Sequence, residues 1–200
     1  MLVLIGLSSF SSAVTSANTA GEHLSYSIGW CLGIYFGILI CVKTSGAHLN
    51  PAITITLAVF KKFPWTQVPI YILAQMLGAF VAALLVLANS NDSIQDFAHN
   101  EYLTPDRILD EKEHLTTAEI FATYPNLNVS NTQAFFDTII GNMMLSMFIF
   151  ALIDKKNMNM KPGKIPFAVS LVVLAINVSF GSNCGAVLNP ARDFAPRYSL

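Results

Sequence analysis

Two asparagine–proline pairs are the residues of this chain best placed to bind a passing polar molecule. Asparagine is a favoured helix N-cap and proline a favoured first helical residue, so each pair predicts the start of a helix. The asparagine carboxamides can also donate N–H groups to an oxygen. Each pair belongs to a seven-residue box, and six of the seven positions are identical between Gly46-Ala47-His48-Leu49-Asn50-Pro51-Ala52 and Gly185-Ala186-Val187-Leu188-Asn189-Pro190-Ala191. A match of this length indicates an internal repeat rather than chance.

Other reactive residue types are scattered along the chain. The cysteines Cys31, Cys41 and Cys184 are odd in number and have no CxxC or Cys/His spacing, so no disulfide or metal site is predicted. Asp137 and Asp154 lie at expected helix ends and form no pair with His48. The sequence contains no GxxxxGK[ST] nucleotide loop. We therefore predict no enzyme, no cofactor and no ion-coupled or ATP-driven carrier.

The amino-acid composition indicates that the elements carrying these residues lie in a membrane. Of 200 residues, 54% are hydrophobic and only 12% are charged, and the mean hydropathy is +0.54. Soluble domains carry about twice that share of charge. The net charge of −1 offers no field for a polyanion, so nucleic acid is excluded as a partner.

Windows without charge mark the expected membrane segments, at residues 1–21, 24–42, 63–91, 138–153 and 165–191. The first is strongly apolar only over seven residues, which predicts the end of a helix. A cleaved signal peptide is the competing interpretation, but the segment lacks a basic n-region.

Lysines and acidic residues are expected on opposite sides of the membrane. Short loops rich in lysine face the cytosol, which predicts cytosolic positions for Lys43, Lys61, Lys62, Lys155, Lys156, Lys161 and Lys164. The acidic stretch 92–119 is then extracellular. Sequons at Asn91 and Asn128 suit that side, whereas the sequon at Asn177 lies in a membrane window and should be unmodified.

The segment after the first box is too short to cross a bilayer. Residues 51–60 would span about 15 Å as a helix, half of a roughly 30 Å hydrocarbon core. Cytosolic lysines flank the segment on both sides, so it must enter and leave on the same side. Three crossings separate Asn50 from Asn189, which predicts a second half-helix entering from the opposite face and meeting the first near mid-membrane.

With these residues in place, SGAHLNPA and GAVLNPARD resemble the paired boxes of the aquaporin superfamily. Asp193 after Arg192 resembles the glycerol-conducting branch, the aquaglyceroporins. The stretch IFATYPNLNVSN, leading into AFFDTIIGN, and the acidic loop before it are similar to animal members of that branch. The resemblance covers nearly the whole chain.

The resemblance implies an all-α membrane protein, an inverted-repeat bundle with two re-entrant half-helices, assembled as a homotetramer in the lipid bilayer. It divides the chain into a first repeat at 1–88, an extracellular loop at 89–133 and a second repeat at 134–200 with its half-helix at 190–199. The family has six full helices. Here the first is short and the sixth is absent, so we expect a chain truncated at both ends.

The resemblance also assigns site residues. A selectivity filter would consist of Trp30, Asn177, Ala186 and Arg192, with Asp193 as the marker of the branch. Asn177 and Ala186 depart from the commoner pattern of a small residue and an aromatic, which leaves the solute range open. The N-terminal tips of the two half-helices, which meet near mid-membrane, would consist of Asn50, Pro51, Ala52, Asn189, Pro190 and Ala191. Pore-facing carbonyls would come from Gly46, Ala47, His48, Gly185, Ala186 and Val187, with the His48 side chain positioning its loop.

The expected function is a passive channel for glycerol, water and other small uncharged solutes such as urea, in the plasma membrane. The alternatives are a water-selective aquaporin and a non-conducting fragment or paralogue.

Overall fold

The computed structural model describes residues 1–103, 117–126, 128–157 and 160–199, without the side chains of 100–103. The described residues form helices and turns, and none of them forms a strand. The longer helices are α1 (Leu2–Thr15), α2 (His23–Ser45), α4 (Val68–Leu103), α6 (Asn131–Ile153) and α7 (Ile165–Cys184). The shorter ones are α3 (Pro51–Val59), α5 (Thr117–Phe121) and α8 (Pro190–Phe194), with 3-10 turns η1 (Trp65–Gln67), η3 (Pro162–Lys164) and η4 (Ala195–Ser199).

Among the described residues, four helical segments are long and apolar enough to cross a membrane: His23–Ser45, Trp65–His99, Asn131–Ile153 and Pro162–Cys184. Large apolar side chains remain exposed on these helices, including Ile70 on α4 and Phe135 on α6. An apolar outer surface with internally bonded backbone is what a lipid environment requires. The chain is therefore a multi-pass membrane protein.

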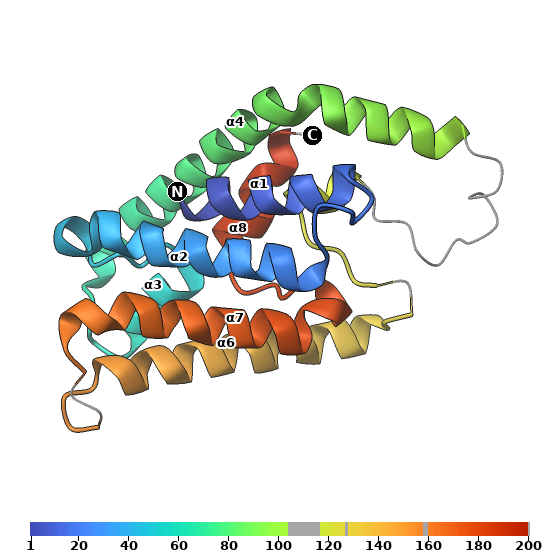
Figure 1. The fold of residues 1–200 in the computed structure, drawn as a ribbon. Coiled ribbons are helices and arrows are strands. Elements are labelled where there is room, and N and C mark those ends of the chain that lie inside the picture. The colour runs from blue at the N-terminus through green and yellow to red at the C-terminus, as the bar shows by residue number, and fades with distance from the viewer. Residues whose placement is uncertain (104–116, 127, 158–159, 200) are drawn as a thin grey trace.

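The long helices surround the two half-helices (Figure 1). Helix α1 packs on α2, α2 on α7 and α7 on α6, while α4 packs against α1 and covers α8 and η4. Helices α3 and α8 lie between the long helices, in the middle of the bundle. Residues 60–67 and the described residues of the connection between α6 and α7 carry six of the seven predicted cytosolic lysines and lie at the same end, at the left of Figure 1.

The two boxes fold alike because their sequences specify the same caps. Gly46 and Gly185 end α2 and α7 in the left-handed conformation, with φ of 73° and 68°, which glycine adopts without a steric cost. Asn50 and Asn189 then cap α3 and α8, each followed by proline at the first helical position. The Oδ1 of Asn50 accepts from the Ala52 N–H at 2.8 Å, and that of Asn189 accepts from the Ala191 N–H at 3.0 Å.

Glycines let α1 approach α2 closely. A Cβ atom at Gly33 would lie 2.7 Å from the carbonyl oxygen of Leu2, and one at Gly6 would lie 2.1 Å from the ring of Trp30. Leu2, Val3, Leu7 and Trp30 join the larger of the two buried clusters. This packing fixes where the Trp30 ring lies.

Some expected boundaries differ from the structure. Helix α4 continues to Leu103, so the loop expected from residue 89 is helical over its first fifteen positions. The segment expected as a half-helix at 190–199 is α-helical only to Phe194 and continues as η4. Helix α3 ends at Val59, one residue before its expected end. The acids Asp106, Asp110, Glu111 and Glu113 of the expected acidic loop lie outside the described residues.

Candidate functional site

A cavity of about 300 Å³ runs past both boxes. Its apolar wall comes from α2, α6 and α7, with residues such as Ile38, Leu145 and Val173. Its polar lining includes Asn50, Asn189, Arg192, Asn177 and His48. The structure thus brings the four expected filter residues and both box asparagines to one cavity, although they come from distant parts of the sequence.

The box asparagines hold the two half-helices together. Asn50 donates from Nδ2 to the carbonyl oxygen of Leu188 at 2.7 Å, and Asn189 donates from Nδ2 to the carbonyl oxygen of Leu49 at 2.9 Å. These two bonds cross between the boxes and relate them as an inverted pair. Each Nδ2 carries two N–H groups, so each asparagine keeps one N–H that the crossed bond does not use.

The backbone before each asparagine has the same left-handed residue in both boxes. Ala47 and Ala186 are left-handed at the same position of each box, with φ of 52° and 49°. Gly46, Ala47, His48, Gly185 and Ala186 all line the cavity.

Val187 does not lie where a pore-facing carbonyl was expected. It is not among the cavity-lining residues of the described chain, and its carbonyl oxygen accepts from Asn142 Nδ2 at 2.8 Å. A carbonyl already occupied by a neighbouring helix is a poor acceptor for a solute. The Val187 carbonyl is therefore bonded to α6, whereas Gly185 and Ala186 of the same box line the cavity.

Arg192 and Trp30 meet at the cavity wall. The guanidinium carbon of Arg192 lies 4.7 Å from the centre of the Trp30 ring, a cation–π distance. Both side chains are buried, with 6% and 8% of their surfaces exposed. The Nη1 atom of Arg192 is buried and has no hydrogen-bond partner among the described residues. A buried donor that makes no hydrogen bond is costly.

Asn177 and Ala186 complete the expected filter. Asn177 is buried in α7, where its Nδ2 donates to the carbonyl oxygen of Val173 at 2.9 Å. That bond uses one N–H and turns the amide along its own helix. Ala186 adds only a methyl group to the wall, and 7% of it is exposed.

His48 is held by a polar contact with Thr54 and a ring contact with Phe63. Its Nδ1 lies 3.2 Å from the Thr54 hydroxyl, which donates to the carbonyl oxygen of Asn50 at 2.9 Å. Gln75 donates to the same hydroxyl at 2.9 Å, and the His48 ring packs against Phe63 with centroids 4.6 Å apart. These contacts connect the ring to the cap of α3, which is the geometry of a positioning side chain.

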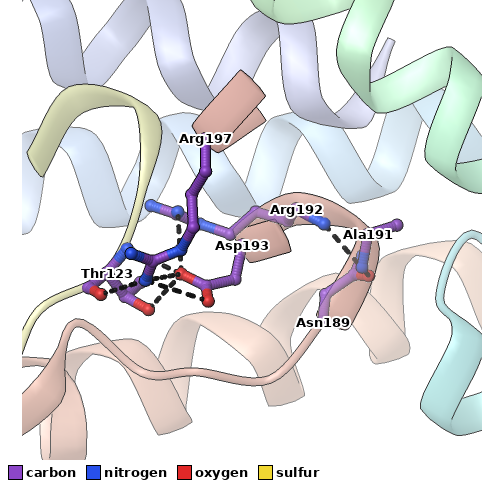
Figure 2. A network of polar contacts seen from close by, with 6 residues as sticks. All are labelled: Thr123, Asn189, Ala191, Arg192, Asp193 and Arg197. Atoms are coloured by element: carbon purple, nitrogen blue, oxygen red, sulfur yellow. Dashed lines mark hydrogen bonds and ion pairs between the residues drawn. The ribbon is translucent and has the colours of Figure 1, made fainter. Parts of the chain in front are cut away.

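Asp193 belongs to a polar network beyond the second box (Figure 2). Its Oδ1 accepts from the backbone N–H of Thr123 at 2.7 Å and from the Thr123 hydroxyl. Arg197 donates to Oδ2 at 3.2 Å and to the Thr123 carbonyl oxygen at 2.8 Å. The Nη1 of Arg192 lies 4.0 Å from Oδ1.

Sequence reasoning missed Thr123 and Arg197. The spacing of Asp193 and Arg197, four residues apart on a helical segment, is a signal that predicts an ion pair. No sequence pattern points from Thr123 to Asp193, because 70 positions separate them.

Comparison with known proteins places this geometry in a family. The family model described as major intrinsic protein matches residues 1–199. Among curated relatives, Aquaglyceroporin-2 of Rhizophagus irregularis is 40% identical over 98% of this chain, and Aquaporin-7-2 of Laccaria bicolor is 37% identical over all of it. Aquaporin-10 of Homo sapiens is 36% identical over 98% of the chain. The chain spans 60%, 59% and 63% of these three relatives, respectively.

Solved structures agree with the sequence comparison. The aquaglyceroporin from Plasmodium falciparum has a TM-score of 0.78 and 31% identity to this chain, and the match covers 99% of this chain and 76% of that one. The predicted all-α membrane fold and the resemblance to aquaporins are both confirmed. With inverted boxes joined at their asparagines and a family match along nearly its whole length, the chain belongs to the major intrinsic protein family.

Proposed function

We propose that the protein is a passive channel, not an enzyme, that conducts glycerol, water and other small uncharged solutes such as urea. The observation that carries the proposal is the pairing of Arg192 with Trp30 at the cavity wall, 4.7 Å apart. Glycerol has a hydroxyl edge and a carbon edge. The guanidinium offers donors to the first edge, and the indole and the apolar wall offer contact to the second.

Cations are excluded by fixed positive charge. Arg192 places a buried guanidinium on the cavity wall. Helix α3 directs the positive end of its dipole toward the point where the boxes meet. A cation that has left its water shell would meet both, with no acidic side chain among the described lining residues to offset them.

Water passes without relaying protons because the central groups are donors. Asn50 and Asn189 each keep an N–H beyond the crossed bonds that join the boxes. A water molecule between them accepts hydrogen bonds from both sides, so its own hydrogens point away from the centre. This orientation interrupts a hydrogen-bonded proton chain.

The solute range follows from the size of Ala186. A methyl group at this position leaves space that a water-selective filter would fill, and Asn177 beside the cavity adds a polar group. Relatives named aquaglyceroporin support the same choice. We propose that the full protein acts as a homotetramer in the plasma membrane.

Stopped-flow swelling of vesicles tests the proposal. Vesicles that contain the full-length protein should re-swell in a glycerol gradient but not in a sucrose gradient. Ala186→Phe should lower glycerol and urea permeability about tenfold, a barrier change of about 1.4 kcal/mol, and lower water permeability less. Water permeability without glycerol flux in the unmutated protein would instead favour a water-selective channel.

A further inference from the structure

Thr123 uses every hydrogen-bonding group it has on two residues that follow the second box. Its backbone N–H and its hydroxyl donate to Asp193 Oδ1, and its carbonyl oxygen accepts from Arg197 at 2.8 Å (Figure 2). Thr123 is 7% exposed, and the residues before it, Ile120 and Phe121, are buried almost completely. The segment from Ile120 to Thr123 is therefore buried and hydrogen-bonded where it contacts Asp193.

Asp193 lies between two arginines and bonds to only one of them. Arg197 Nη2 lies 3.2 Å and 3.3 Å from its two carboxylate oxygens. Arg192 Nη1 lies 4.0 Å from Oδ1, beyond hydrogen-bond distance. Oδ1 is already occupied by both donors of Thr123. A carboxylate oxygen with two or three donors in place has little capacity left for a further one.

We propose that Thr123 is a positioning residue for the solute filter. By occupying Asp193 Oδ1, its hydroxyl prevents Arg192 Nη1 from moving from 4.0 Å to hydrogen-bond distance, and so keeps the guanidinium over Trp30 at the cavity wall. The inference rests on the proposed function, since it explains how the filter keeps its arginine at the cavity wall although a carboxylate lies next to it. Without the hydroxyl, Arg192 needs a shift of about 1 Å to reach Oδ1 at charge-assisted hydrogen-bond distance.

The shape of Thr123 is a separate property from its hydroxyl. A Cβ at Gly185, which lines the cavity, would lie 3.1 Å from Thr123 Cγ2, so the methyl group packs against the box. Thr123→Val keeps this methyl group and removes only the O–H. Thr123→Ser keeps the O–H and removes the methyl group. The two variants therefore separate packing from positioning.

The experiment measures glycerol, water and cation permeability of the full chain in vesicles at matched protein content. Thr138→Val is the matched control, because among the described residues the Thr138 hydroxyl bonds only to the carbonyl oxygen of Ala134 in its own helix. We expect Thr123→Val to lower the glycerol-to-water permeability ratio about tenfold and to raise cation leak, because Arg192 then turns toward Asp193, which engages one of its donors and offsets its charge. Thr123→Ser and Thr138→Val should keep the ratio of the unmutated protein.

Other results would overturn the inference. An unchanged ratio and an unchanged cation leak in Thr123→Val would show that the hydroxyl does not position Arg192. Equal changes of the permeability ratio in Thr123→Val and Thr123→Ser would assign the effect to packing. An equal loss of glycerol and water flux in Thr123→Val would do the same. If the unmutated protein carries water but no glycerol, the proposed solute range fails. In that case the cation leak still tests the positioning role, because it should rise in Thr123→Val and stay at the level of the unmutated protein in Thr123→Ser.

Discussion

Arg192 is the residue on which the proposed selectivity depends most directly. Arg192 is 6% exposed, its guanidinium lies over Trp30, and its buried Nη1 has no hydrogen-bond partner in the part of the chain that the structure describes. Burying an ionised group is expensive, and such residues in membrane proteins mark pathways. The arrangement is explained if the charge repels cations and the guanidinium donors that face the cavity bind solute hydroxyls.

Substitution of Arg192 separates these two roles. Arg192→Val removes charge and donors, and we expect cation conductance in planar bilayers to rise at least about tenfold, which needs a barrier change of only about 1.4 kcal/mol. Arg192→Lys keeps the charge but loses the planar fork. It should preserve cation exclusion and lower glycerol permeability. Background ion conductance in Arg192→Val with normal water flux would show that the filter lies elsewhere.

At the scale of single residues, the sequence predicts those functional residues that lie in or next to a repeated motif. Asn50 and Asn189 could be selected because the box occurs twice, and Arg192 because it follows the second box. Thr123 could not be selected, because its role depends on a contact with Asp193 that only the folded chain creates. The position of the Val187 carbonyl depends in the same way on Asn142.

The element that fixes one wall of the filter is the α1–α2 pair. Gly6 lies against the Trp30 ring, and Gly33 lies against the backbone of Leu2. Small residues at such positions allow membrane helices to pack closely, where dispersion contacts replace the hydrophobic effect as the driving force. The Trp30 ring is consequently positioned by helix packing as well as by Arg192.

Enlarging Gly33 should separate the two helices. Gly33→Ala places a Cβ 2.7 Å from the Leu2 carbonyl oxygen, which cannot move without its helix. We expect the free energy of unfolding to fall by about 1–3 kcal/mol, measured by denaturant unfolding in detergent. Gly78→Ala is the control, because its Cβ would meet nothing within 4 Å, and it should be neutral or slightly stabilising. Equal stability of the two variants would contradict the packing argument.

Sequence predicted the re-entrant element better than the ends of the long helices. Residues 51–60 are flanked by lysines and are half the length of a crossing, and these constraints define α3 closely. The end of α4 could not be found in this way, because hydropathy locates the membrane and not the last helical residue. Polar residues such as Asn91 and Asp92 continue the same helix out of the apolar window.

At the scale of the whole molecule, the inverted pair of boxes is the main fact. The crossed bonds from Asn50 to Leu188 and from Asn189 to Leu49 place two opposed half-helices on one cavity. Inverted repeats also occur in carriers that alternate between two states. Here the tips are joined by hydrogen bonds, and a single cavity passes both, which favours a fixed pore over a moving barrier.

A transport assay with an imposed driving force tests this central claim most directly. Vesicles containing the full-length protein are given equal labelled glycerol on both sides, together with a proton gradient, a sodium gradient or external ATP. A fixed pore predicts that internal and external glycerol stay equal in every case, and that added glycerol equilibrates faster than in protein-free vesicles. Accumulation of glycerol above the external concentration under any of these driving forces would contradict the account, because a passive pore cannot perform that work.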